Sequence, residues 1–100
     1  MKSGPENAMK ARLVKLLNHY GIFHWPAAAS PYGVAGVPDR LAILPRSGRL
    51  MGLEVKAPGK KATPLQAAFG LHMQKSGALW FLIDGDEALD NLKLFLEETL

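Results

Sequence analysis

One short segment constrains the fold of this chain more than any other. Residues 78–83 form a nearly continuous apolar run, Ala-Leu-Trp-Phe-Leu-Ile, with Gly77 before it and Asp84-Gly85 after it. A strand that is apolar on both faces is typical of sheets that helices cover on both sides. The run therefore predicts a layered α/β fold in which this strand is buried in the middle of a sheet.

Helical periodicity appears in three other segments. The first runs from Pro5 to about His19 and is expected to end at Gly21. The second begins at Thr63-Pro64, an N-cap followed by proline at the first helical position, and stops at Gly77. Its expected apolar stripe is Leu65, Ala68, Phe69 and Met73. The last helix spans roughly 86–98.

The remaining β-prone runs are short. They cover residues 22–25, 40–44 and 49–56, and the last two are expected to form a hairpin around the turn 45–48. Residues 26–38 are rich in Pro, Gly, Ala and Ser, and so long a loop in a small domain is expected to be functional. The predicted order is α-β-β-β-α-β-α, a mixed central sheet flanked by helices in one domain spanning 1–100.

Composition removes several kinds of chemistry. The chain has no cysteine, which excludes disulfides, a thiolate nucleophile and Cys-ligated zinc. No apolar run approaches the roughly 20 residues that span a bilayer, so we expect no membrane and a cytoplasmic location. The net charge of +3 and the pI of about 9.4 favour polyanionic partners. Basic residues gather on the first helix and after the third strand, whereas acidic residues gather near the C-terminus.

Glu54 and Lys56 carry the most informative chemistry. Alternate residues of a strand point to the same face, so both side chains project together, and the hairpin brings Asp39 near them. Two carboxylates offer hard oxygen ligands to Mg²⁺ or Mn²⁺, and a lysine can stabilise charge on a phosphate. Gly52, on the same face, is expected to leave room for a ligand backbone. An isolated Glu-x-Lys would more simply be an exposed ion pair.

The motif is not isolated. Gly36-Val37-Pro38-Asp39 precedes the hairpin, and Glu54-Val55-Lys56-Ala57-Pro58-Gly59 and then Gln66 follow it. This pattern resembles VRR-Nuc, the virus-type replication-repair nucleases of the PD-(D/E)XK superfamily, over about Glu6 to Ile83. The resemblance implies a PD-(D/E)XK nuclease-like core that hydrolyses phosphodiester bonds.

The resemblance also implies individual roles. Asp39 and Glu54 would be metal ligands, the Val55 carbonyl a further metal contact, and Lys56 the catalytic lysine. Gln66 would be the motif glutamine of the second helix. The family often has an acidic residue on its first helix, for which Glu6 is the only candidate.

Glu6 and Gln66 each have helix capping as an alternative role, and four other residues are candidates for binding nucleic acid. Ser3-x-x-Glu6 and Thr63-x-x-Gln66 both fit helix capping boxes, so capping and function stay open for each. Trp25 is expected in the core. The candidates for nucleic-acid contact, by phosphate binding or base stacking, are Lys60, Lys61, Arg40 and Tyr32.

The sequence thus predicts a metal-dependent, structure-directed DNA endonuclease that uses Mg²⁺ or Mn²⁺. Domains similar to it occur in phage and bacterial replication, repair and recombination, which implies a bacterial host cell. A chain so small is expected to work as a homodimer with two sites, suited to branched DNA such as a four-way (Holliday) junction. The alternatives are a non-catalytic nucleic-acid-binding module, a protein-interaction domain and a restriction-type enzyme.

Overall fold

The computed structural model describes residues 4–27 and 33–100, and its elements follow the predicted order. They are α1 (Pro5–His19), β1 (Phe23–Pro26), β2 (Arg40–Ile43), β3 (Leu50–Val55), α2 (Pro64–Lys75), β4 (Leu79–Ile83) and α3 (Asp86–Thr99). The predicted α/β class with a mixed sheet is confirmed, and predicted and observed boundaries differ by one or two residues.

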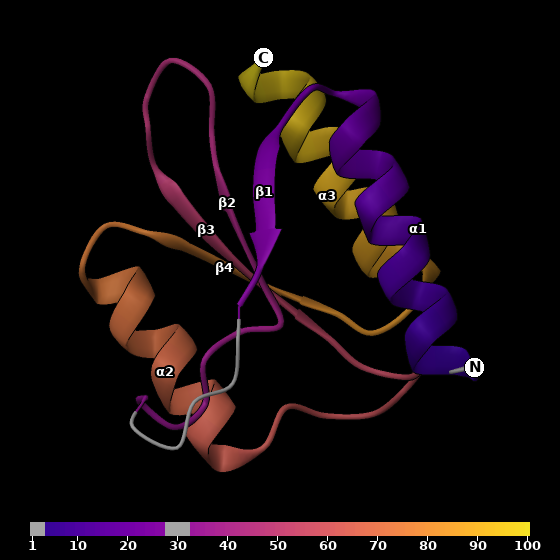
Figure 1. Ribbon diagram of the computed structural model, residues 1–100, viewed down its shortest axis with the longest axis vertical. Helices are drawn as coiled ribbons and strands as arrows, with labels where there is room; N and C mark the ends of the chain where they lie inside the picture. Colours follow the sequence, from indigo (N-terminus) through magenta and orange to yellow (C-terminus); the bar gives the residue numbers. More distant parts are fainter. Residues whose placement is uncertain (1–3, 28–32) are drawn as a thin grey trace.

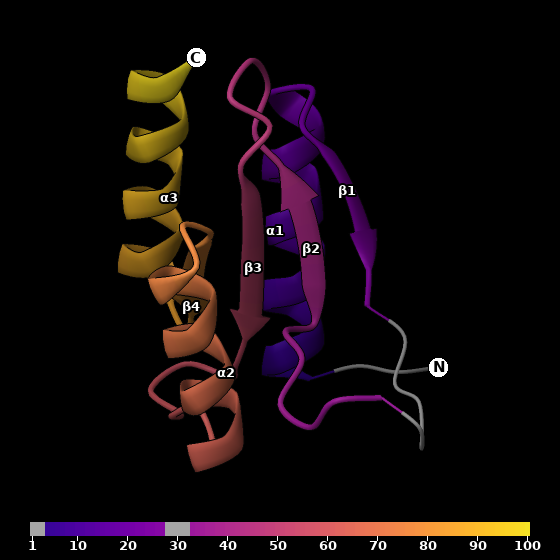
Figure 2. The same ribbon diagram turned by 90° about the vertical axis from the view of Figure 1, so that its left-hand side faces the viewer.

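The four strands form one sheet in the order β1-β2-β3-β4. β1 and β2 pair antiparallel, as do β2 and β3, and β4 runs parallel to β3 after the crossover through α2. Helices α1 and α3 lie together on one side of the sheet, and α2 lies on the other (Figure 1). Figure 2 shows β1, β2 and β3 side by side with α1 behind them. The sheet is therefore the middle of three layers.

The prediction that residues 78–83 lie in the middle of the sheet was wrong. β4 is an edge strand, and only Ile83 at its end is fully buried. Helix α2 packs on one face of β4 and α3 on the other, so both faces of the strand are apolar although its outer edge pairs with no described strand. Coverage by helices, rather than a central place in the sheet, explains the apolar run.

The predicted apolar stripe of α2 was also wrong in part. Leu65 is 62% exposed and Ala68 is exposed, whereas Gly70 and Met73 are buried. A Cβ added to Gly70 would lie 2.4 Å from the Trp80 ring, so the missing side chain is what allows the helix to approach β4 this closely. The helix therefore packs through a glycine, which an analysis of apolar periodicity does not detect.

The core lies between the sheet and the pair α1 and α3. It contains Met9, Leu13, Leu17, Ala42, Met51, Leu53, Val55, Leu89, Leu92 and Leu96 among its buried members. Each fully buried aliphatic side chain contributes roughly 1.5–3 kcal/mol, so this layer is the main source of stability. No helix in residues 4–27 and 33–100 is long and apolar enough to cross a membrane.

Candidate active site

The hairpin brings Asp39 and Glu54 to the same end of the sheet. Arg40 pairs with Leu53 in the β2–β3 register, so Asp39, one residue before β2 begins, lies level with Glu54. The Val55 backbone N–H donates a hydrogen bond of 2.7 Å to Asp39 Oδ2. This bond orients the Asp39 carboxylate at the point where β3 extends beyond β2.

The loop before Asp39 is held against the first turn of α2. Gly36 has φ +85°, and a Cβ there would lie 2.3 Å from the Leu65 backbone oxygen. Both the left-handed conformation and the close approach require glycine. Pro38 is buried beside Gly52, where an added Cβ would lie 2.8 Å from its ring. The Gly-x-Pro-Asp motif thus has a structural reason, since it fixes Asp39 relative to α2 and β3.

Gly52 does not serve the purpose expected from the sequence. A Cβ at this position would lie 2.7 Å from the Met73 sulfur as well as close to Pro38. Side chains of the protein itself therefore fill the space above Gly52, and the glycine allows α2 to pack on β3 rather than leaving room for a ligand.

Glu54 is a buried acid without full compensation. Its side chain is 1% exposed, and its Oε1 atom has no hydrogen-bond partner. Burial raises the pKa of Glu54 from 4.5 to about 8, helped by a hydrogen bond to Asp39 and by the Asp39 negative charge, and opposed by Lys56. A buried carboxylate beside another carboxylate is costly unless a cation joins them. The pair therefore has the electrostatics of a cation site.

Lys56 follows directly after β3. Its backbone N–H donates to the Ile83 carbonyl oxygen at 3.0 Å, which extends the parallel β3–β4 pairing by one residue. The side chain is half-buried, and its positive charge lowers the pKa of Glu54. Asp39, Glu54 and Lys56 therefore lie at the same end of β3, and their roles in metal binding and catalysis stay predictions.

The oxygen atoms at this site suit a hard divalent cation. The Val55 N–H points to the β2 side of β3, and the carbonyl of a strand residue points to the same side as its N–H. The Val55 carbonyl therefore faces the side on which Asp39 lies. Carboxylate and carbonyl oxygens are ligands that Mg²⁺ and Mn²⁺ prefer, and the Glu54 Oε1 atom lacks any other partner.

Glu6 has a different partner. Its Oε2 atom lies 3.5 Å from Lys10 Nζ, one helical turn along α1, and its charge contributes to the raised pKa of Glu54. No group of three or more His, Asp or Glu side chains within residues 4–27 and 33–100 is arranged to hold a metal. The alternative capping box starts at Ser3, outside the described residues. The N-cap of α1 is Gly4, which makes no side-chain capping bond.

Gln66 takes part in a capping box, as one of its two interpretations predicted. Its backbone N–H donates to Thr63 Oγ1 at 3.2 Å, and the Thr63 N–H donates to Gln66 Oε1 at 2.9 Å. The close approach of Gly36 to the first turn of α2 brings the Gln66 backbone near the loop that carries Asp39. A catalytic role of the Gln66 amide stays a prediction.

The candidates for nucleic-acid contact do not all share one environment. Lys60 and Lys61 are exposed in the loop after β3, which a 3.1 Å bond from the Gly59 N–H to the Asp84 carbonyl anchors. Arg40 is half-buried and bound to His24. Tyr32 lies outside the described residues. Trp25, expected in the core, is only half-buried, and its ring contacts the Phe23 ring in a tilted arrangement with centroids 5.3 Å apart.

Lys10 was not among the predicted site residues. Its Nζ atom lies 3.8 Å from Asp39 Oδ1 as well as 3.5 Å from Glu6. The spacing Glu6-x-x-x-Lys10 predicts the ion pair on α1, but the sequence has no signal for the approach to Asp39.

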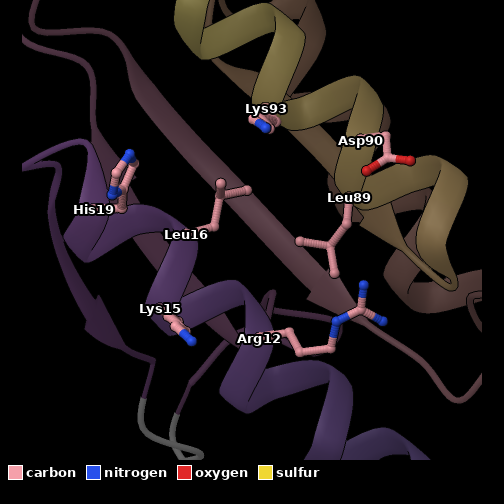
Figure 3. Close-up of a pocket in the computed structure, with 7 residues that line it drawn as sticks. All are labelled: Arg12, Lys15, Leu16, His19, Leu89, Asp90 and Lys93. Atoms are coloured by element: carbon pink, nitrogen blue, oxygen red, sulfur yellow. The ribbon is translucent and has the colours of Figure 1, made fainter.

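A separate pocket of about 400 Å³ lies between α1 and α3, where Lys15, Lys93 and Asp90 surround Leu16 and Leu89 (Figure 3). None of the residues of the nuclease-like pattern lines it. A second pocket lies beside Asp39 and is lined by Asp39, Arg40 and Val55 among others.

Comparison with known proteins gives one short match. The chain is 56% identical over 34 residues to a protein of Acyrthosiphon pisum secondary endosymbiont phage 1 named "Putative nuclease p44". The match covers 34% of this chain and 36% of that protein. No family model matches the chain.

Proposed function

We propose that this protein is a metal-dependent, structure-directed DNA endonuclease that hydrolyses phosphodiester bonds with Mg²⁺ or Mn²⁺. The observation that carries the proposal is the contact between Asp39 and the buried Glu54, whose Oε1 atom has no partner. The short match to a phage protein named as a nuclease supports the same class of enzyme. Branched DNA as the substrate follows from the resemblance described above.

Each residue of the site has its own role in the proposed reaction. A divalent ion, when bound, polarises the phosphodiester and lowers the pKa of water. Asp39 and Glu54 would hold it, with Asp39 oriented by the Val55 N–H. Lys56 stabilises the negative charge that grows on the phosphate as water attacks phosphorus and the P–O bond breaks. Gln66 would contact the same phosphate from the start of α2.

A homodimer is part of the proposal, and one surface supports it. The strand register places five apolar side chains on one face of β1, β2 and the start of β3: Phe23, Trp25, Leu41, Ile43 and Leu50. Phe23 is 68% exposed and Leu50 is 37% exposed, and Trp25, Leu41 and Ile43 are half-buried. Among residues 4–27 and 33–100, α2 is the helix on this face, and it packs on β3 and β4 rather than on β1 and β2 (Figure 1). None of these five side chains carries a charge, so two copies can meet through them without like-charge repulsion.

The first experiment is cleavage of labelled linear, flapped and four-way DNA with Mg²⁺, Mn²⁺ or EDTA. We expect metal-dependent cutting by the wild type, and a loss of about a thousandfold in Lys56→Ala. Lys75→Ala, an exposed lysine at the end of α2, is the matched control and should cut normally. Binding of DNA without cutting in either metal would instead favour a non-catalytic binding module.

Equilibrium sedimentation at micromolar concentration tests the dimer. We expect a dimer for the wild type and a monomer for Phe23→Glu. Leu71→Glu adds the same charge at a 51% exposed leucine of α2 and should remain dimeric. A monomeric wild type would overturn this part of the proposal.

A further inference from the structure

A small pocket opens directly beside Asp39. Its volume is about 240 Å³, and it lies between α1, the end of β1 and the start of β2. Its lining is Lys10, Leu13, Pro26, Ala27, Asp39, Arg40 and Val55. Apart from Asp39, the charged lining residues are two cations, Lys10 and Arg40. Pockets that enclose whole small molecules measure roughly 300–1,000 Å³, so this one suits a group the size of a phosphate.

Two hydrogen bonds in series, through His24 to Asn18, hold the Arg40 guanidinium in place. The Arg40 Nη1 atom lies 2.8 Å from His24 Nδ1, and His24 Nε2 lies 2.6 Å from Asn18 Oδ1. Arginine can only donate, so His24 Nδ1 must accept, and the ring hydrogen therefore sits on Nε2 and is donated to Asn18. One neutral tautomer of His24 satisfies both bonds. Burial, and then the Arg40 charge, lower the pKa of His24, which keeps that neutral form present at physiological pH.

Lys10 is held more loosely. Its contacts with Glu6 and Asp39, at 3.5 Å and 3.8 Å, are longer than a normal N–H···O hydrogen bond, and its side chain is 40% exposed. The ammonium group can therefore turn from the carboxylates to an anion that enters the pocket. Arg40 and Lys10 thus combine a fixed guanidinium with an adaptable point charge, a combination that suits a phosphate oxygen cluster.

We propose that Lys10 and Arg40 form a subsite for the DNA backbone phosphate next to the one that is cut, and that His24 and Asn18 are positioning residues for Arg40. The inference rests on the proposed nuclease function. Four of the other lining residues, Leu13, Pro26, Ala27 and Val55, are apolar and offer no side-chain groups to read a base edge. The subsite therefore positions the strand without selecting a sequence.

The test is the salt dependence of duplex DNA binding in EDTA, between 50 and 200 mM salt. Each phosphate contact contributes about 0.9 to the slope of log affinity against log salt concentration. This slope is negative, and we expect Lys10→Gln and Arg40→Gln each to make it shallower by about one. Lys15→Gln removes the same charge from the same helix, at a residue that lines the pocket next to α3 (Figure 3), and should leave the slope unchanged.

Two His24 variants separate positioning from general stability. His24→Phe keeps a ring but removes the acceptor, and should weaken DNA binding severalfold although Arg40 retains its charge. His24→Asn places a carbonyl acceptor where Nδ1 was and should recover part of that loss. Thermal unfolding of each variant shows that it is folded. An unchanged slope in folded Arg40→Gln, or equal binding by the two His24 variants, would overturn the inference.

Metal-dependent cleavage by the wild type, measured in parallel, distinguishes the two proposals. If the wild type cuts DNA and the slopes do not change, the subsite fails and the nuclease stands. If the slopes become shallower as expected but the wild type cuts no DNA, Lys10 and Arg40 bind phosphate in a non-catalytic DNA-binding protein. The nuclease proposal then fails.

Discussion

The two faces of β3 differ in how completely their side chains are satisfied. Toward α1 and α3, Met51, Leu53 and Val55 are buried among other apolar side chains. Toward α2, the same strand carries Gly52, packed under Met73, and then Glu54, whose buried Oε1 atom has no partner. One face therefore stabilises the fold, whereas the other carries an electrostatic cost that a bound cation would relieve. Such a local cost is typical of functional sites.

The largest expected effect concerns pH and the α2 face. The pKa of Glu54 is 4.5 ordinarily and about 8 in the fold, so the folded state holds a proton that the unfolded state releases between these values. The stability that depends on this proton is complete below pH 4.5 and is lost as pH rises through 8, by on the order of 5 kcal/mol in total. Urea unfolding in EDTA from pH 5 to 9 should show this decline.

Glu54→Gln and added metal are the controls for that decline. The variant cannot ionise at this position, so its stability should change little over the same pH range. Mg²⁺ or Mn²⁺ should restore the wild type at pH 8–9 and have no such effect on Glu54→Gln. If the stability of the two proteins depends on pH in the same way, another group compensates the Glu54 charge. The α2 face of β3 would then carry no electrostatic cost.

The next effect concerns the apolar face. Leu53→Ala removes a fully buried side chain from the core and should lower the free energy of unfolding by about 3 kcal/mol. Leu94→Ala, at a 55% exposed position of α3, is the control and should change it by less than about 0.5 kcal/mol. Denaturant unfolding at pH 5–6, where Glu54 is protonated, isolates the packing effect. A loss no larger than the control's would mean that this face is not the main source of stability.

A smaller effect is expected at Gly52. The added methyl group of Gly52→Ala would meet Met73 and Pro38, and should cost about 2 kcal/mol by overpacking. A double-mutant cycle with Met73→Ala measures how much of this cost arises from the contact with α2. If Gly52→Ala instead keeps its stability and loses DNA cleavage, the space above Gly52 belongs to the ligand, as the sequence first suggested.

The smallest effect separates the two roles of the first turn of α2. Thr63→Ala removes one acceptor of the capping box and should cost about 1 kcal/mol, read as a lower midpoint in thermal unfolding. Gln66→Glu preserves a capping acceptor but replaces the amide, so stability should change little while cleavage falls. Normal cleavage by Gln66→Glu would leave Gln66 with its capping role alone.

The sequence by itself determined the local structure of this protein. Helix limits at Pro5, Thr63 and Gly77, the hairpin around residues 45–48 and the alternation in β3 all depend on neighbours in the chain. The same locality brought Asp39 level with Glu54, because a hairpin register follows from the strand pattern and the turn. The core of the candidate site was predictable for that reason.

Tertiary structure alone decided how the layers meet. The edge position of β4 and the packing of α2 through Gly70 depend on which surfaces cover which, and apolar periodicity does not encode that choice. The approach of Lys10 to Asp39 and the hydrogen bonds that link Asn18, His24 and Arg40 join residues from different elements. The unpartnered oxygen of Glu54 likewise appears only when the layers close over it, because burial and missing partners are properties of the assembled fold.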